Sequence, residues 1–129
     1  MTFIGRRERI SQELRDQMAW AEQKTASNRR LALYVAFNYG GRAEILDAAE
    51  RYTGGGEEAF EACLYAPEMR PPDLVIRTSG ERRLSNFLIW QTAYSELVFD
   101  EVLWPDFAID HLEAALREFE ARQRRFGAR

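Results

Sequence analysis

The chain contains 129 residues, of which 46% are hydrophobic, and these values fit a single globular domain with a core of its own. Its formal charge of -3 provides no general positive field, so nucleic acid is not expected as a partner and any anion site must be local. With one cysteine and one histidine, the chain can form neither an internal disulfide nor a zinc site built from Cys and His side chains.

The first third of the chain predicts the end of a strand, a helix and a second strand. Residues 2–5 end in glycine after only two apolar side chains, as the last part of a strand would. A helix is expected over residues 7–25, because apolar side chains recur there at spacings of three and four, at Ile10, Leu14, Met18 and Ala21. The apolar run at 31–37 is typical of a strand buried on both faces of a parallel sheet.

Two helices should follow the polar turn at residues 38–41. The first is expected over residues 42–52, with three side chains facing inward, Ile45, Leu46 and Ala49. Three glycines at 54–56 end it and form a mobile link. A short helix is then expected over residues 57–64.

The second half of the chain repeats the alternation of strand and helix. A buried strand is expected at residues 73–76, after two prolines that favour an extended entry. Residues 77–80 form the turn after it. A helix is expected over residues 86–94 and a short strand at 97–99.

The last predicted helix begins near Asp110, where Asp110 and Glu113 resemble a capping box. Gly127 is placed to end it. Its inner stripe should contain Ile109, Leu112, Leu116 and Phe119.

These elements predict an α/β fold, with a mostly parallel sheet flanked by helices. Only two full strands and the end of a third are visible, fewer than the roughly five or six of a typical sheet. We therefore expect residues 1–129 to form a single but partial domain, half of a larger fold.

Ligands of open parallel sheets bind beyond the carboxyl ends of the strands, which directs attention to residues 38–42 and 77–85. In the second loop, Arg77 and Arg83 flank a glycine, and Ser85 is placed to cap the following helix. Two guanidinium groups, a hydroxyl and a helix N-terminus would suit a diphosphate. The alternative is that the arginines pair with Glu81 and other carboxylates, and that Ser85 is only a cap.

The identity of these residues is more specific than their spacing. DLVIRTSGE at 73–81, followed by RLSNFL at 83–88, strongly resembles the signature of cis-prenyltransferases of the undecaprenyl diphosphate synthase type. The resemblance extends over the whole chain, through NYGGR at 38–42, AYSEL at 93–97, LWPDF at 103–107 and RRFG at 124–127. It implies the carboxyl-terminal half of that fold.

That family joins isopentenyl diphosphate to an allylic diphosphate such as farnesyl diphosphate, with magnesium assisting the departure of diphosphate. The resemblance implies that Arg77, Arg83 and Ser85 bind isopentenyl diphosphate. It also implies that Glu96 binds Mg²⁺ and takes part in catalysis, a role suited to carboxylate and phosphate oxygens. Without the resemblance, Glu96 would be only an acid at a helix end.

Arg125 and Gly127 match an Arg-x-Gly motif that, in the family, reaches across a dimer interface toward the partner's isopentenyl site. A homodimer is therefore implied. The alternative is a helix terminus where cations are favoured by the dipole. The resemblance and the lack of a run of about 20 apolar residues predict a cytoplasmic protein, with peripheral contact to the inner membrane face through its lipid product.

The family's amino-terminal half carries a loop reading Met-Asp-Gly-Asn-Gly-Arg-Trp, whose aspartate is essential, and nothing in this chain matches it. We therefore expect a chain that binds isopentenyl diphosphate but is inactive alone. The favoured explanation is a truncated form of an active synthase. The alternatives are an accessory subunit similar to the Nogo-B receptor type, or a non-enzymatic phosphate-binding scaffold module.

Overall fold

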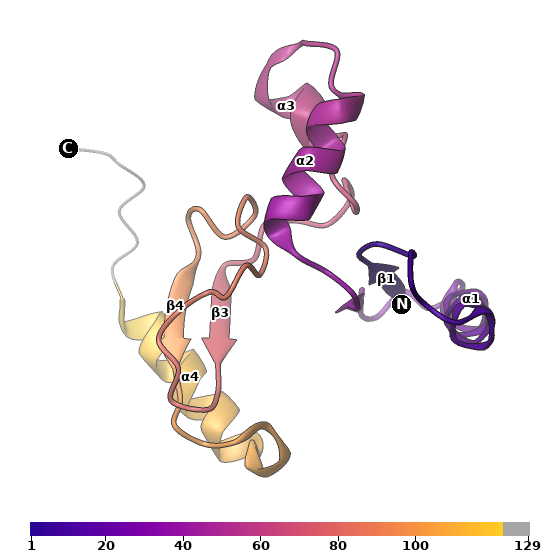
Figure 1. Cartoon of the computed structure of the whole chain (residues 1–129). Helices are drawn as coiled ribbons and strands as arrows, with labels where there is room; N and C mark the ends of the chain where they lie inside the picture. Colours follow the sequence, from indigo (N-terminus) through magenta and orange to yellow (C-terminus); the bar gives the residue numbers. More distant parts are fainter. Residues whose placement is uncertain (123–129) are drawn as a thin grey trace. The chain divides into compact units, whose positions relative to one another are not determined.

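A computed structural model gives the fold of the chain, and the structure describes residues 1–122. The chain forms two compact units, Met1–Met69 and Arg70–Arg129 (Figure 1). Within the described residues, each unit contains one pair of parallel strands together with helices. The predicted α/β fold with parallel strands is therefore confirmed.

The first unit is built around strands β1 (Thr2–Ile4) and β2 (Tyr34–Ala36). They are parallel, with Phe3 opposite Val35, and helix α1 (Gln12–Thr25) lies between them in sequence and contacts β1. The helix begins five residues later than predicted, because Ser11 caps it: the Ser11 Oγ accepts a hydrogen bond of 3.3 Å from the Leu14 N–H. Of the four apolar positions on which this helix was predicted, Met18 is buried within it and Ile10 is buried just before it begins.

The strand predicted at 31–37 is shorter than expected, and the prediction that it is buried on both faces is wrong. Only Tyr34–Ala36 pair with β1, and Leu31, Leu33 and Phe37 are exposed. An uninterrupted apolar run predicts a doubly covered strand only when helices or strands lie on both sides of it, and the described residues leave these positions open.

Two turns that follow β1 and β2 lie against each other in the first unit. Gly5 has a φ of 124°, and a Cβ atom there would lie 2.2 Å from the carbonyl oxygen of Phe37, so only glycine fits. Asn38 has a φ of 50°, and its amide nitrogen donates to the carbonyl oxygens of Arg6 at 2.8 Å and Glu8 at 3.0 Å. The turn at 38–41 thus fixes the segment after β1 as well as the start of the next helix.

Helices α2 (Gly41–Arg51) and α3 (Gly56–Glu61) complete the first unit. The predicted inner face of α2 is wrong: Leu46 is 63% exposed, whereas Glu44 and Ala48 are buried. Glu44 is 1% exposed and is held by the hydroxyl of Tyr39 and by the N–H of Tyr65 at 3.0 Å. Because a carboxylate satisfied in this way can be buried, the helix is rotated from the orientation that hydrophobicity alone predicts.

The second unit is built around strands β3 (Leu74–Arg77) and β4 (Glu96–Phe99), which run parallel with Arg77 opposite Phe99 (Figure 1). The predicted helix at 86–94 is wrong: this segment is a series of turns. Ser85, Asn86 and Leu88 all have positive φ values, between 44° and 65°, which a right-handed helix cannot contain.

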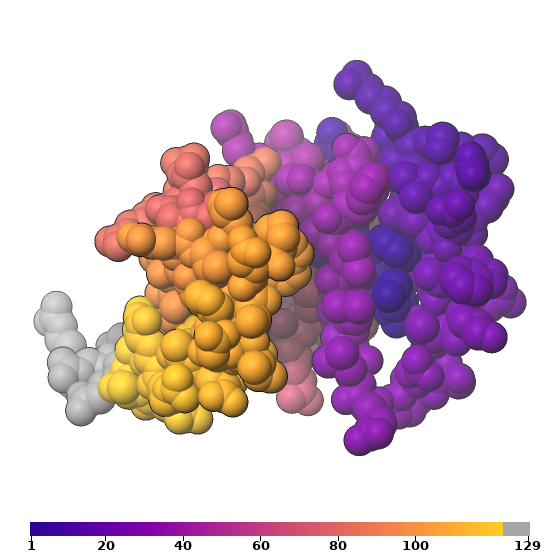
Figure 2. Space-filling model, turned by 90° about the horizontal axis from the view of Figure 1, so that it is seen from below, coloured from indigo at the N-terminus to yellow at the C-terminus, as the bar shows by residue number. Residues whose placement is uncertain are grey.

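After β4 come a short 3-10 helix, η1 (Trp104–Asp106), and helix α4 (Ile109–Ala121). The predicted capping box is wrong, because the helix is capped by Ala108 without a side-chain hydrogen bond, and Asp110 instead accepts from the N–H of His111 at 3.0 Å. Helix α4 is visible at the surface of the molecule in Figure 2. Three of the four residues predicted for its inner stripe are exposed: Ile109, Leu112 and Leu116. Ala115 is the buried position.

No helix within residues 1–122 is both long enough and apolar enough to cross a lipid bilayer.

Candidate anion-binding site

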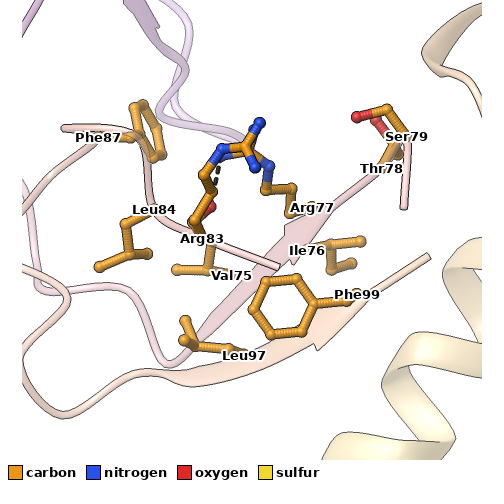
Figure 3. A pocket seen from close by; sticks show the side chains of 10 residues that line it. All are labelled: Val75, Ile76, Arg77, Thr78, Ser79, Arg83, Leu84, Phe87, Leu97 and Phe99. Carbon is orange, nitrogen blue, oxygen red and sulfur yellow. Dashed lines mark hydrogen bonds between the residues drawn. The ribbon is translucent and has the colours of Figure 1, made fainter. Parts of the chain in front are cut away.

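A pocket of about 330 Å³ opens at the carboxyl end of β3 (Figure 3). One part of its lining is apolar and comes from both strands and the intervening loop: Val75, Ile76, Leu84, Phe87, Leu97 and Phe99. The other part is polar and follows the end of β3: Arg77, Thr78, Ser79 and Arg83. Two cations beside an apolar wall are the features that a site for an amphipathic anion would need.

The structure brings together the three residues predicted to bind a diphosphate. The Nη1 of Arg77 donates 2.8 Å to the Ser85 Oγ and also donates to the carbonyl oxygen of Arg83, a contact drawn in Figure 3. The loop between β3 and β4 thus folds back so that Arg77, at the end of the strand, touches residues six and eight positions further on. Ser85 and the Arg83 backbone hold the guanidinium of Arg77 in place.

For Arg83, the structure shows the alternative named in the sequence analysis, pairing with a carboxylate. Its guanidinium forms an ion pair with Glu81, and the side chains of Arg83 and Glu81 are 64% and 40% exposed. Exposed pairs of this kind contribute little stability, so a multiply charged ligand can compete with Glu81 for Arg83.

The predicted helix N-terminus is absent from this site. Ser85 has a φ of 50°, lies in a turn and accepts a hydrogen bond from Arg77, so it is not a helix cap. The backbone N–H groups of Ser79 and Gly80 are directed elsewhere, to the carbonyl oxygens of Val102 at 2.7 Å and Asp100 at 2.9 Å. The groups at this pocket that could attract an anion are therefore guanidinium groups and not a helix N-terminus.

Glu96 is the first residue of β4 and not a helix-end acid. Its Oε2 accepts a hydrogen bond of 2.8 Å from Nη1 of Arg122, which also pairs with Glu118. These two contacts, Glu96 first, raise the pKa of the Arg122 guanidinium above its ordinary value. The carboxylate proposed from sequence as a cation ligand thus already has a positive partner.

The described residues do not by themselves form a magnesium site. Within residues 1–122, no group of three or more His, Cys, Asp or Glu side chains is arranged to hold a metal ion. Glu96 could supply one oxygen ligand, and the remaining ligands would have to come from elsewhere, phosphate oxygens included. Two further predicted site residues, Arg125 and Gly127, lie outside the described residues.

One polar network in the first unit was not expected from the sequence. Arg6 binds Asp47 through both ends of its guanidinium, with Nε at 3.0 Å from Oδ2 and Nη2 at 2.6 Å from Oδ1. Tyr65 also donates its hydroxyl to Asp47. These bonds, that from Arg6 first, lower the pKa of Asp47 to about 2, while burial and Asp47 raise the pKa of Tyr65 to about 12. The three residues are up to 59 positions apart in sequence, and no local pattern indicates their contact.

Comparison with known proteins gives the chain its family. The family described as "Putative undecaprenyl diphosphate synthase" matches residues 1–127. An isoprenyl transferase of Caulobacter vibrioides is 48% identical, with 97% of this chain and 52% of that relative covered. A ditrans,polycis-undecaprenyl-diphosphate synthase ((2E,6E)-farnesyl-diphosphate specific) of Pseudomonas aeruginosa is 46% identical, with coverages of 98% and 55%. The chain spans about half the length of the curated relatives it matches.

Solved structures agree with the sequence comparison. Lavandulyl diphosphate synthase from Lavandula x intermedia, solved in complex with dimethylallyl diphosphate, matches with a TM-score of 0.93 and 34% identity, covering 98% of this chain and 59% of that one. A probable undecaprenyl diphosphate synthase from Campylobacter jejuni matches with a TM-score of 0.89 and 34% identity, covering 98% and 62%. The chain belongs to the undecaprenyl diphosphate synthase family of prenyltransferases.

Proposed function

We propose that this chain carries the isopentenyl diphosphate site of a cis-prenyltransferase, which condenses isopentenyl diphosphate with an allylic diphosphate. One observation carries the proposal: Arg77 and Arg83 line a pocket whose other wall is apolar, and the Ser85 hydroxyl accepts a hydrogen bond from Arg77. The charged end of the substrate would bind the guanidinium groups, and its five-carbon chain would lie against the apolar wall.

The role of the site in that reaction is positioning. Guanidinium groups bind phosphate oxygens with a fixed geometry, so a diphosphate held by Arg77 and Arg83 has a defined orientation. Orientation of the attached double bond toward an allylic carbon lowers the entropic part of the barrier to carbon–carbon bond formation. In that step a carbon–carbon bond forms at the allylic carbon, the bond from that carbon to its diphosphate group breaks so that diphosphate leaves, and a proton is then lost from the new chain.

Magnesium enters this proposal through Glu96. Its carboxylate would contribute one oxygen ligand, with substrate phosphate oxygens as further ligands, and the ion would neutralise charge on a departing diphosphate. Because Glu96 binds Arg122 in the structure, such a role requires Arg122 to share or release the carboxylate. Arg125 and Gly127 would complete the isopentenyl site of a partner in a homodimer.

We expect the chain alone to bind isopentenyl diphosphate without turning it over. The observation behind this expectation is that the described residues hold a single candidate carboxylate, Glu96, and no cluster of metal ligands. The same observation supports the alternative, an accessory subunit or a phosphate-binding scaffold module. Incorporation of labelled isopentenyl diphosphate into product by the purified chain tests both, since measurable turnover would contradict the expectation and the alternative alike.

Binding provides the direct test of the site. Calorimetric titration of the full chain with isopentenyl diphosphate should give an affinity that R77A and R83A each weaken, by about tenfold to a hundredfold, because each removes charge-assisted hydrogen bonds. Arg82 is a matched control: it lies in the same loop and is exposed, so R82A should leave the affinity within about twofold of the wild type. Equal affinities in R77A, R83A and R82A would refute the site.

A further inference from the structure

His111 and Asp100 contact each other next to the turn that follows Arg77, and the proposed function gives them no role. Nδ1 of His111, in the first turn of α4, is 2.9 Å from Oδ2 of Asp100, the residue after β4. An ionised carboxylate only accepts hydrogen bonds, so Nδ1 of His111 carries a hydrogen and donates a hydrogen bond to Asp100. The contact joins α4 to the segment that follows β4.

The other oxygen of Asp100 orders the same segment. Its Oδ1 accepts a hydrogen bond of 2.9 Å from the N–H of Val102, which fixes the direction of that peptide. The bond from the Val102 N–H and the contact with His111, in that order, hold the pKa of the Asp100 carboxyl below its ordinary value. At neutral pH the carboxylate is therefore ionised and accepts both bonds.

This ordered segment in turn holds the turn after β3. Asp100 donates its N–H to the carbonyl oxygen of Arg77 at 2.8 Å and accepts from the N–H of Gly80 at 2.9 Å. The carbonyl oxygen of Val102 accepts from the N–H of Ser79 at 2.7 Å. Three backbone hydrogen bonds thus connect residues 100–102 to residues 77–80.

The turn needs such support because of its backbone conformation. Ser79 and Gly80 have φ values of 73° and 70°, in the left-handed region, which is unfavourable for a residue with a Cβ atom such as Ser79. A conformation of this kind persists only where surrounding contacts hold it. In this chain the contacts come from Asp100 and Val102.

His111 is itself held on a second side. Its ring lies 5.8 Å from that of Phe107, centroid to centroid, and Phe107 stacks on Trp104 at 5.8 Å. The side chain of His111 is one-third exposed, so substitutions there can be accommodated. The position of the imidazole is therefore set by aromatic contacts on one side and by Asp100 on the other.

We propose that His111 is a positioning residue for the anion site: by donating to Asp100 it fixes residues 100–102, which hold the Arg77–Gly80 turn and with it the start of the Arg77 side chain. The part of this inference that concerns a diphosphate rests on the proposed function. The part that concerns the turn rests on the hydrogen bonds alone.

The test uses three variants of the full chain that differ in whether a donor faces Asp100. Gln and Glu have the same shape, but only Gln can donate a hydrogen bond, so H111Q should preserve the contact and H111E should lose it. H111F keeps an aromatic ring beside Phe107 without a donor. Amide hydrogen exchange measured by NMR at Ser79 and Gly80 reports the turn, exchange at Val98, a buried residue of β4 whose N–H lies in the ladder with β3, reports global unfolding, and calorimetry with inorganic pyrophosphate reports anion affinity.

The inference predicts that H111E and H111F accelerate exchange at Ser79 and Gly80 by about tenfold or more, with little change at Val98. Pyrophosphate affinity should fall about threefold to tenfold in the same two variants. H111Q should remain close to the wild type in both measurements. If His111 only stabilised the fold as a whole, exchange at Val98 would accelerate as much as exchange at Ser79 and Gly80.

Unchanged exchange at Ser79 and Gly80 in H111E and H111F would overturn the inference, as would equal acceleration at Val98. If one of these variants does not fold, the other gives the same comparison with H111Q. Failure of the wild-type chain to bind pyrophosphate would count against the proposed function, whereas exchange at Ser79 and Gly80 would still decide the role of His111.

Discussion

Arg77 and Ser85 are joined directly, side chain to side chain, by a hydrogen bond of 2.8 Å from Nη1 of the arginine to Oγ of the serine. Arg77 ends β3, and Ser85 lies in the turns that replace the expected helix. The hydroxyl therefore has two possible uses, to orient the guanidinium and to contact a bound phosphate. Both uses depend on Ser85 keeping a left-handed backbone with a φ of 50°.

Replacement of Ser85 separates the hydroxyl from the backbone conformation. S85A and S85G both remove the bond to Arg77, so both should weaken isopentenyl diphosphate binding, by about tenfold. Glycine adopts positive φ without strain, so S85G should be more stable than S85A by about 1 kcal/mol in urea unfolding. Calorimetry and urea unfolding measure the two effects. An S85G affinity equal to that of the wild type would show that the hydroxyl has no part in binding.

The pH dependence of stability should reveal Asp47. Its pKa of about 2 in the folded state lies below its ordinary value of 3.8, because Arg6 and Tyr65 donate to the carboxylate. A depressed pKa means that this group stabilises the fold above about pH 4, and that the contribution is lost as the pH falls toward 2. Between pH 6 and pH 3, the free energy of unfolding measured in urea should fall less in D47N than in the wild type. D16N, on the exposed face of α1, is the control and should lose as much stability as the wild type between the two pH values. An equal loss in D47N and the wild type would contradict the stabilising role of Asp47.

Strand prediction succeeded where short apolar runs pair with a parallel neighbour. β1, β3 and β4 lie within one residue of their predicted positions, because Ile4, Val75 and Leu97 belong to runs bounded by polar turns. The helix at 86–94 was predicted because Phe87, Trp90 and Tyr94 have helical spacing. That spacing carries no information about φ, and the positive φ of Asn86 and its neighbours ends any helix there.

Inner helix faces were harder to predict, because the side chains that fill them need not be apolar. On α2, Glu44 is buried by hydrogen bonds from Tyr39 and Tyr65, contacts that depend on residues outside the helix. On α4, Ile109 remains exposed although it has the spacing of an inner residue. Periodicity predicts that one face is apolar, but it does not determine what covers that face within the described residues.

The candidate site was predicted in part. The motif predicted that Arg77, Arg83 and Ser85 act together, and in the structure Arg77 and Arg83 line one pocket while Ser85 is hydrogen-bonded to Arg77. The supporting contacts could not be predicted, because no motif specifies the backbone bonds from Asp100 to the loop or the side-chain contact of His111 with Asp100. The roles of all these residues in binding remain predictions.

Glu44 should be among the most important residues for the stability of the first unit. E44A would leave the Tyr65 N–H and the Tyr39 hydroxyl without their carboxylate acceptor in a site that is 1% exposed, and we expect a loss of about 2–4 kcal/mol in the free energy of unfolding. Glu50 lies on the exposed side of the same helix, so E50A should change the free energy by less than about 0.5 kcal/mol. Similar losses in the two variants, measured by urea unfolding, would show that the buried contacts contribute little.

The contact between Glu96 and Arg122 gives a test of the magnesium proposal that does not depend on turnover. If Glu96 supplies a ligand, Arg122 competes with the cation for the same oxygen, 2.8 Å from its Nη1. R122Q should therefore increase the affinity of the chain for Mn²⁺ in the presence of pyrophosphate, by about threefold to tenfold, and E96Q should reduce it. Electron paramagnetic resonance of free Mn²⁺ measures both.

R117Q is the matched control, because Arg117 pairs with Glu113 at 3.5 Å on the exposed surface of α4 and should not affect the cation. Unchanged Mn²⁺ affinity in E96Q would leave Glu96 with a structural role alone, that of fixing the end of α4 to β4 through Arg122.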